Sequence, residues 1–493
     1  MNPDAAAHNN QVASSPFNKA GADVVLRACN KVDFYVYKAV LLLASDFFED
    51  MFSLNQPPDD SDTIDGRPVI EVSETSNTLD MLLRLCYPVD DPNISLAELD
   101  TVLSAAIKYE MREAIQILSR TLQTYVQEKP REAYAVACRH MLETEASMAA
   151  QRWKELVRAT EGSGDFALTL PGVTFIPEME DISALAYHNL LSYLRTGTTP
   201  THFCQATDTE PSSSCAYGNQ VPAAFTREDA DVVLQSSDNI SFRAHKLILS
   251  MNGAESLLSS ALNIGELDSM PVFHVDVAAS ALAYILRLCY PAGMTSSSPG
   301  PGSRTYDEAV RLATKYNMEA ILRLIRHHMK YAFRRDHLAR YLISMRYGWN
   351  PEAQDAARRL ADNPLHDIHS EALTTTTASA YQTLLEYHYR YQIAVMEAYI
   401  PYASIPIHSQ YSSNSINVSQ GQWRQLWFNT GKDPAGSERY IRTMPYMLAE
   451  LAVEHARKAP SHGSLQPARI ISLHEDLKRR VDAAVKDLRV SYL

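Results

Sequence analysis

Histidine residues are the first candidates for catalytic chemistry in this chain of 493 residues. His474-Glu475 resembles the start of a zinc-protease helix motif, but no second histidine follows at the spacing that the motif needs. His366 and His369 have no acidic partner at a recognisable spacing. The chain also lacks the glycine-rich loops that hold phosphates and the GxSxG turn of serine hydrolases. The sequence therefore predicts no enzyme activity and no cofactor.

The six cysteines form no CxxC pair, which argues against a zinc cage or a disulfide framework. His202, Cys204 and Cys215 lie close together in sequence, but three ligands without a fourth do not indicate a zinc site. Cys86 and Cys289 follow apolar helix stripes and are interpreted as small residues on buried faces. We expect no bound metal, and reduced thiols of the kind found in cytoplasmic or nuclear proteins.

Composition argues against two classes of partner. The formal net charge is -13, from 45 Lys and Arg against 58 Asp and Glu, and no basic stripe is present. Binding to nucleic acid is therefore not expected. The apolar runs are far shorter than the roughly 20 residues that a membrane-spanning helix needs. The N-terminus also lacks the pattern of a secretory signal. We expect a cytoplasmic or nuclear protein that contacts other proteins, not membranes.

The chain contains an internal duplication. Ala22 to Leu26, ADVVL, recurs at Ala230 to Leu234 (231 − 23 = 208), and RLCYP recurs 203 residues later (287 − 84 = 203). Three further pairs extend the match: Lys108-Tyr109-x-Met111 with Lys315-Tyr316-x-Met318, Tyr134 and Arg139 with Tyr341 and Arg346, and Tyr187-x-x-Leu190-Leu191-x-Tyr193 with Tyr381-x-x-Leu384-Leu385-x-Tyr387. Each unit spans about 170 residues, which is the size of a domain and larger than a short solenoid repeat.

Each copy shows the same order of expected elements. In the first, Asp23 to Leu26 and the alternating Val32, Phe34 and Val36 predict a hairpin of two strands. The apolar residues after Lys38 predict a helix, and Pro68 opens a short strand. Further helices follow, so the predicted fold is α+β and predominantly helical.

The repeats and the composition divide the chain into seven parts. They are a disordered N-terminus (1–21), a first α/β domain (22–125), a first helical module (126–195), a linker (196–228), a divergent second α/β domain (229–332), a second helical module (333–403), and a C-terminal tail with an amphipathic helix (404–493).

The α/β part of each copy resembles the BTB (POZ) domain. It carries the D-V-x-L, [HY]-K-x-[VI]-L, S-x-x-F-x-x-M-F and K-Y-x-M signatures, and the closest likeness is to BTB proteins of mushroom-forming fungi. The residues that carry the resemblance are Asp23, Lys38, Phe48, Met51 and Phe52 in the first copy, and Asp231, His245 and Lys246 in the second. The second copy has lost the aromatic pair of the first. The resemblance implies a protein-interaction module that dimerises, with these residues as its candidate interface.

Two features of the family bear on the candidate interface. In some BTB domains an aspartate and a basic residue form a charged pocket at the dimer interface. Here the positions are Asp23 with Lys38 and Asp231 with Lys246, and each pair is alternatively a local salt bridge. Other BTB domains recruit cullin-3 through a hydrophobic-x-Glu motif after the M-F element, but Ser-Leu-Asn-Gln-Pro-Pro follows Phe52 here.

The leading hypothesis is a non-catalytic protein-interaction scaffold. Its two BTB-like copies are expected to pack as an intramolecular pseudo-dimer, because a tether raises their effective concentration above that of a second chain. Pairing between chains as a homodimer stays open. The alternative function is a substrate adaptor of a cullin-3 ubiquitin ligase.

Overall fold

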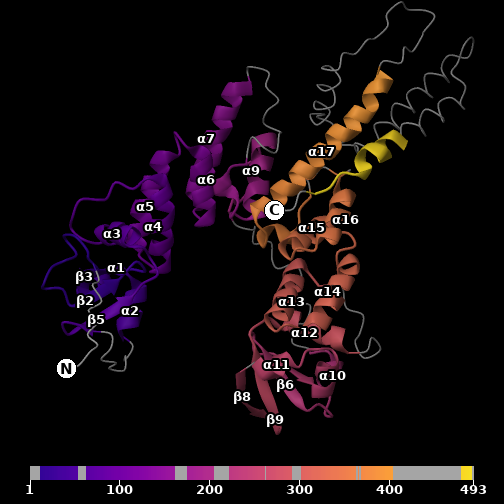
Figure 1. The fold of residues 1–493 in the computed structure, drawn as a ribbon, viewed down its shortest axis with the longest axis horizontal. Helices are drawn as coiled ribbons and strands as arrows, with labels where there is room; N and C mark the ends of the chain where they lie inside the picture. The colour runs from indigo at the N-terminus through magenta and orange to yellow at the C-terminus, as the bar shows by residue number, and fades with distance from the viewer. Residues whose placement is uncertain are drawn as a thin grey trace, which may run out of the picture. The chain divides into compact units, whose positions relative to one another are not determined.

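A computed structural model describes residues 11–53, 63–161, 175–204, 221–260, 262–290, 301–361, 363, 365, 368–403 and 479–490 (Figure 1). The chain divides into two compact units. The first comprises Met1–Asp165, Ile176–Met179 and Tyr193–Gln205, and the second comprises Phe166–Phe175, Glu180–Ser192 and Ala206–Leu493. Residues 180–192, which belong to the first copy by sequence, are therefore part of the second unit.

The first copy begins with a mixed sheet in the order β1-β3-β2-β5-β4. Its strands are β1 (Gln11–Val12), β2 (Val24–Arg27), β3 (Val32–Val36), β4 (Thr63–Ile64) and β5 (Arg67–Glu71). Strand β2 pairs antiparallel with β3 and parallel with β5. Val24, Val25 and Leu26 are buried because β2 lies between two other strands. The predicted hairpin of β2 and β3 is confirmed.

Nine helical segments of the first copy are described. They are α1 (Lys38–Ala44), α2 (Asp46–Ser53), α3 (Ser76–Arg84), α4 (Leu96–Lys108), α5 (Arg112–Tyr125), α6 (Pro130–Arg139), α7 (Glu143–Glu161), the 3-10 turn η3 (Pro177–Met179) and α9 (Ala184–Thr196). Leu79, Leu82 and Leu83 are buried, as the apolar stripe of α3 predicts. Ser95 begins α4 with a reciprocal capping box that includes Glu98.

The second copy repeats this architecture. Its sheet has the order β7-β6-β9-β8, with the strands β6 (Val232–Ser236), β7 (Ser241–Ala244), β8 (Leu262–Leu267) and β9 (Met270–Val275). Its helical segments are η4 (Ala223–Phe225), α10 (Lys246–Met251), α11 (Ser256–Ser260), α12 (Ala279–Cys289), α13 (Ser303–Lys315), α14 (Glu319–Ala332), α15 (His337–Arg346), α16 (Asn350–Leu360), η6 (Glu371–Thr374) and α17 (Ala378–Ala403). Figure 1 shows α12, α13 and α14 beside the second sheet. The predicted α+β, predominantly helical fold is confirmed.

Residues with positive φ occupy equivalent positions in the two copies. Glu110 and Asn317, the variable residues of the K-Y-x-M signature, have φ of 51° and 52°. This left-handed residue ends one helix before the next begins. Three other pairs also have positive φ: Met141 with Gly348 lie between helices, whereas Lys31 with Asn239 and Asp65 with Asp268 lie in turns between strands.

Two predicted unstructured segments are partly ordered. Strand β1 and the fully buried Phe17 lie within the expected disordered N-terminus 1–21. Phe203, Cys204 and Phe225 are buried within the expected linker 196–228. The reason is the same in both segments, because an aromatic side chain completes a hydrophobic core: Phe17 and Phe225 each pack edge-on against the tyrosine of RLCYP, with ring centroids 5.2 and 5.3 Å apart. Residues 1–10 and 205–220 lie outside the described residues.

The end of the predicted tail docks on the second unit. Val481 and Val490 are buried, and the Val490 N–H donates to Gln354 Oε1 of α16 at 2.8 Å. The Gln354 amide donates to the Leu488 carbonyl at 3.4 Å. Residues 404–478, which make up most of the predicted tail, lie outside the described residues.

Candidate functional site

The first turn of α1 is held by two side chains from elsewhere in the first sheet domain. Asp23 Oδ1 accepts a hydrogen bond from the Lys38 backbone N–H at 2.6 Å. The Tyr87 hydroxyl accepts one from the Tyr37 N–H at 2.9 Å. The first amides of a helix have no partner within the helix, and the helix dipole favours negative charge there. Three separate signatures, D-V-x-L, Y-K and RLCYP, therefore meet at one helix start.

The second copy builds the same cap on α10. Asp231 Oδ1 accepts from the Lys246 N–H at 2.8 Å, and the Tyr290 hydroxyl accepts from the His245 N–H at 3.0 Å. His245 Nδ1 also lies 2.9 Å from the Tyr290 hydroxyl, and its Nε2 lies 3.5 Å from Asp229 Oδ1. Burial raises the pKa of Tyr290, so its hydroxyl stays protonated at neutral pH. The candidate residues Asp231, His245 and Lys246 thus lie together.

The local salt bridges Asp23–Lys38 and Asp231–Lys246, given above as the alternative to a charged pocket, are absent from the part of the chain that the structure describes. Each carboxylate accepts a backbone N–H instead, because the helix start places that amide closer than the lysine ammonium. Lys38 Nζ lies 4.6 Å from the ring centroid of Phe52, a cation–π contact.

The predicted aromatic residues of α2 have different surroundings. Phe48 is only 2% exposed and stacks between Phe52 and Tyr109, with ring centroids 6.2 and 5.2 Å away. It therefore belongs to the core and cannot itself contact a partner. Met51 and Phe52 are half-buried. The aromatic signature thus secures α2 against α4 more than it forms a surface.

Among the described residues, the two most exposed large apolar side chains lie at equivalent positions of α1 and α10, which the sequence analysis did not single out. Leu43 is 91% exposed and Met251 is 77% exposed (251 − 43 = 208). Leu247 of α10 is 70% exposed, and Phe47 of α2 is 39% exposed. The signal was present in the apolar run Ala39 to Ala44, because a short helix on a sheet cannot bury every side of a fully apolar segment.

A family model for the BTB/POZ domain matches residues 15–125 and 224–332. The chain contains two tandem BTB domains. BTB domains are protein-protein interaction modules, and the duplicated helix cap with its exposed apolar residues lies within both matched ranges. A search of curated proteins found no match to this chain.

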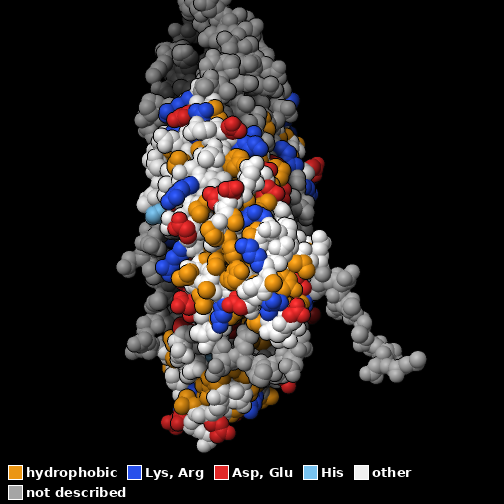
Figure 2. All heavy atoms as spheres, turned by 90° about the vertical axis from the view of Figure 1, so that its left-hand side faces the viewer, with side chains coloured by type: hydrophobic (Ala, Val, Ile, Leu, Met, Phe, Trp, Pro, Cys, Tyr) orange, Lys and Arg blue, Asp and Glu red, His pale blue; other side chains and the backbone are white. Residues whose placement is uncertain are grey.

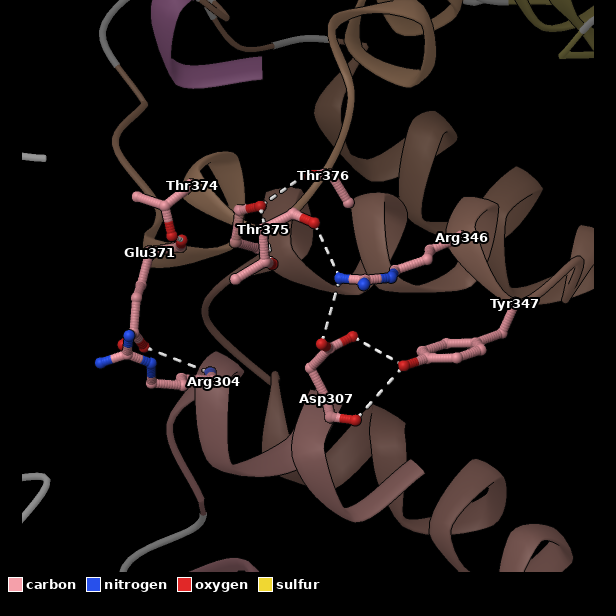
Figure 3. Close-up of polar contacts among 9 residues, drawn as sticks. Arg304, Asp307, Arg346, Tyr347, Glu371, Thr374, Thr375 and Thr376 are labelled. Atoms are coloured by element: carbon pink, nitrogen blue, oxygen red, sulfur yellow. Dashed lines mark hydrogen bonds and ion pairs between the residues drawn. The ribbon is translucent and has the colours of Figure 1, made fainter. Parts of the chain in front are cut away.

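A polar cluster joins the second BTB domain to its helical module (Figure 3). Arg346 of α15 reaches Asp307 of α13, with Nη1 3.1 Å from Oδ2, and donates to the Thr375 carbonyl at 2.7 Å. The Tyr347 hydroxyl donates to Asp307 Oδ1 at 2.8 Å. Glu371 Oε2 accepts from the Ser303 hydroxyl at 2.8 Å. These contacts tie together three segments: α13, the end of α15, and η6 with the adjoining Thr375.

The first BTB domain carries the equivalent cluster. Asp100 of α4 binds Arg139 of α6, and His140 Nε2 lies 2.8 Å from its other oxygen. Arg139 also donates to the Glu178 carbonyl at 2.7 Å. Burial acts to raise the pKa of Asp100, but the hydrogen bond from His140 and the charge of Arg139 outweigh it and lower that pKa. The equivalent residues Arg139 and Arg346 therefore each connect a BTB domain to the helical module that follows it.

Equivalent segments of the two helical modules pair reciprocally within the second unit. The Ala184 N–H donates to the Thr376 carbonyl and the Ala378 N–H donates to the Ile182 carbonyl, both at 2.8 Å. Ser183 and Thr377 form the antiparallel bridge between them. Since 377 − 183 = 194, Ser183 faces its own counterpart Thr377, and the two hydrogen bonds on either side exchange equivalent groups.

The side chains of α9 and α17 continue this reciprocity. The Tyr187 hydroxyl donates to Gln382 Oε1 at 2.9 Å, and the Tyr381 hydroxyl lies 3.0 Å from His188 Nδ1. Tyr187 corresponds to Tyr381, and His188 corresponds to Gln382 (381 − 187 = 194). All four side chains are buried. Reciprocal contacts of this kind are typical of a two-fold interface between identical surfaces.

The residues that the structure describes include no group of three or more His, Cys, Asp or Glu placed to hold a metal ion. No described helix is long and apolar enough to cross a membrane. Burial raises the pKa of both the Cys86 and Cys289 thiols to about 12, which agrees with their interpretation as packing residues.

Proposed function

We propose that this protein is a non-catalytic scaffold of the cytoplasm or nucleus that binds other proteins through its two BTB domains. The observation that carries the proposal is the pair Leu43 and Met251, which are 91% and 77% exposed at the same position of both domains. Apolar side chains that gather into an exposed patch commonly mark a site where another protein binds. Figure 2 shows apolar side chains gathered between charged ones on one face of the molecule.

We further propose that the two copies act as an intramolecular pseudo-dimer. The reciprocal contacts of α9 with α17 support this pairing, and they favour the helical modules as its centre. A tethered pair of matching surfaces outcompetes pairing between chains. Light scattering after size-exclusion chromatography is expected to give the mass of one chain. A stable dimer whose interface includes both BTB domains would exclude the pseudo-dimer.

Affinity capture from the source cells, followed by mass spectrometry, tests the scaffold function. Leu43→Asp and Met251→Asp are each expected to lose a subset of the partners that the wild-type chain captures, and the double variant is expected to lose most of them. Tyr331→Asp, another exposed site at 64%, is the matched control. Unchanged capture by a folded double variant would contradict the proposal. Recovery of cullin-3 would instead favour the adaptor function.

A further inference from the structure

A hollow of about 200 Å³ lies in the first unit, between α7 and the C-terminal end of α9. Its lining residues are Gln151, Lys154, Glu155, Arg158, Tyr193 and Gly197. Both BTB domains lie outside this lining, so the hollow is separate from the interaction surfaces proposed above.

Lys154 is a buried cation whose charge has no acidic partner among the described residues. The residue is 6% exposed, and its Nζ donates to the Tyr193 carbonyl at 3.1 Å and lies 4.2 Å from the Tyr193 ring centroid. An ammonium carries three N–H donors, so two remain beyond this carbonyl. Burial, and then the charge of Arg158, lower the pKa of Lys154. A buried charge of this kind is costly unless an opposite charge joins it.

A second cation lies on the same side of α7. Arg158 follows Lys154 by four residues, which places both on one helix face. The carboxylate of Glu155 also lines the hollow, but Arg152 Nη1 pairs with it at 3.1 Å. Gln151 adds an amide that can donate hydrogen bonds. The hollow therefore presents an excess of positive charge and donors.

The second copy shows that the fold does not require these cations. At the separation of 207, the counterparts of Lys154 and Arg158 are Ala361 and Leu365, which are 1% and 2% exposed (361 − 154 = 207; 365 − 158 = 207). There, α16 ends at Leu360, so Ala361 caps the helix and Leu365 lies beyond it, and both positions carry buried apolar side chains.

Gly197 lines the hollow close to the Lys154 ammonium. A Cβ atom at Gly197 would lie 2.7 Å from Lys154 Nζ, and the backbone there has φ of +80°, which favours glycine. Its counterpart in the second copy is Tyr391, which is buried (391 − 197 = 194). The first copy therefore has both the space and the charge that the second copy lacks.

We propose that this hollow binds an oxyanion, namely a phosphate or carboxylate group, through Lys154, Arg158 and Gln151. Such a group supplies the missing negative charge, and its oxygens accept from the ammonium, guanidinium and amide donors. The site does not depend on the scaffold function, since it uses no residue of either BTB domain.

Titration of the full-length protein with inorganic phosphate at constant ionic strength, followed by calorimetry, tests the site. Wild type is expected to bind saturably. Arg158→Gln removes an exposed charge without touching the core, and it is expected to weaken binding by roughly tenfold. Lys154→Ala introduces the residue found at the equivalent position of the second copy, Ala361. This variant is expected to abolish saturable binding. Lys31→Gln, an exposed lysine elsewhere in the first unit, is the control for net charge and is expected to bind like wild type.

Two outcomes would overturn the site: no saturable binding by wild type, or equal binding by wild type and the two site variants. Thermal unfolding of each variant shows whether it remains folded. A phosphoserine peptide and its glutamate counterpart distinguish the sources. Tighter binding of either peptide than of free phosphate supports an anion carried by a protein segment, and equal or weaker binding supports a free anion.

Discussion

Tyr187 and Tyr381 stand at the same position of the two copies, and their rings meet edge to face with centroids 6.3 Å apart. Each hydroxyl lies beside the residue that follows the other tyrosine, Gln382 in one direction and His188 in the other. Residues 184–192 of α9, which belong to the first copy by sequence, are thereby part of the second unit.

Removal of one tyrosine hydroxyl from the contact between α9 and α17 is expected to weaken that contact. Tyr187→Phe takes a donor from the buried Gln382 carbonyl oxygen and should lower the free energy of local opening by about 1 kcal/mol. Hydrogen exchange of peptides from α9 and α17 measures this loss. Tyr331→Phe, in the same unit but 64% exposed, serves as the control. Equal protection in both variants would show that the reciprocal hydrogen bonds do not stabilise the pairing.

The Asp100 cluster predicts a pH-dependent junction in the first copy. Asp100→Asn should reduce the free energy of unfolding at neutral pH by about 1 to 3 kcal/mol, since it removes a charge that binds Arg139 and His140. The pKa of Asp100 is lowered below its ordinary value of 3.8 on folding. Its stabilisation is therefore present above that ordinary value and is lost as the pH falls through the lowered one.

Urea unfolding of wild type and Asp100→Asn at a series of pH values checks this expectation. The difference between the two proteins should shrink towards low pH, where the wild-type carboxyl becomes protonated. A difference that stays constant with pH would show that the packing of the side chain, not its charge, stabilises the junction.

The helix caps predict that Asp23 stabilises the fold mainly as a hydrogen-bond acceptor and less through its negative charge. Asp23→Ala should cost about 1 kcal/mol of stability, the usual effect of losing a helix cap. Asp23→Asn should retain most of the wild-type stability, because the amide oxygen can still accept a hydrogen bond from the Lys38 N–H. Asp231→Asn and Asp231→Ala form the matched pair in the second copy. Equal costs for the two Asp23 variants, measured by thermal unfolding, would favour an ion pair instead.

The cysteines should differ in their rates of alkylation. Cys29 is exposed, whereas Cys138, Cys204 and Cys289 are buried. The Cys138 thiol, 3.5 Å away, and burial raise the pKa of Cys204, which depletes its reactive thiolate. Peptide mapping after iodoacetamide treatment should show Cys29 reacting at least roughly tenfold faster than the buried three. Similar native rates, or rates that do not converge in denaturant, would contradict this burial pattern.

Local patterns predicted the elements well because they depend on residues close in sequence. The stripe of Leu79, Leu82 and Leu83 describes one face of one helix and is confirmed. Phe34 and Val36 are buried as the alternation predicts, but Asp33 between them is buried as well, beside Arg27. Phe48 and Leu43 show what such local patterns cannot predict, namely which apolar residues of a short helix are buried. Both are apolar residues near the start of the helical region, yet Phe48 is buried against Tyr109 and Leu43 is 91% exposed. Which side of a short apolar helix meets the core depends on residues more than 60 positions away.

The amino-acid sequence by itself determined the duplication, the order of strands and helices, and the resemblance of both copies to the BTB domain, because repeated motifs and apolar periodicity are local properties. Only the tertiary structure decided what the repeated residues do. Asp23 and Tyr87 meet at one helix start, Arg139 finds Asp100, and α9 pairs with α17. These are contacts between distant segments, set by how the helices pack, and no spacing within either copy encodes them.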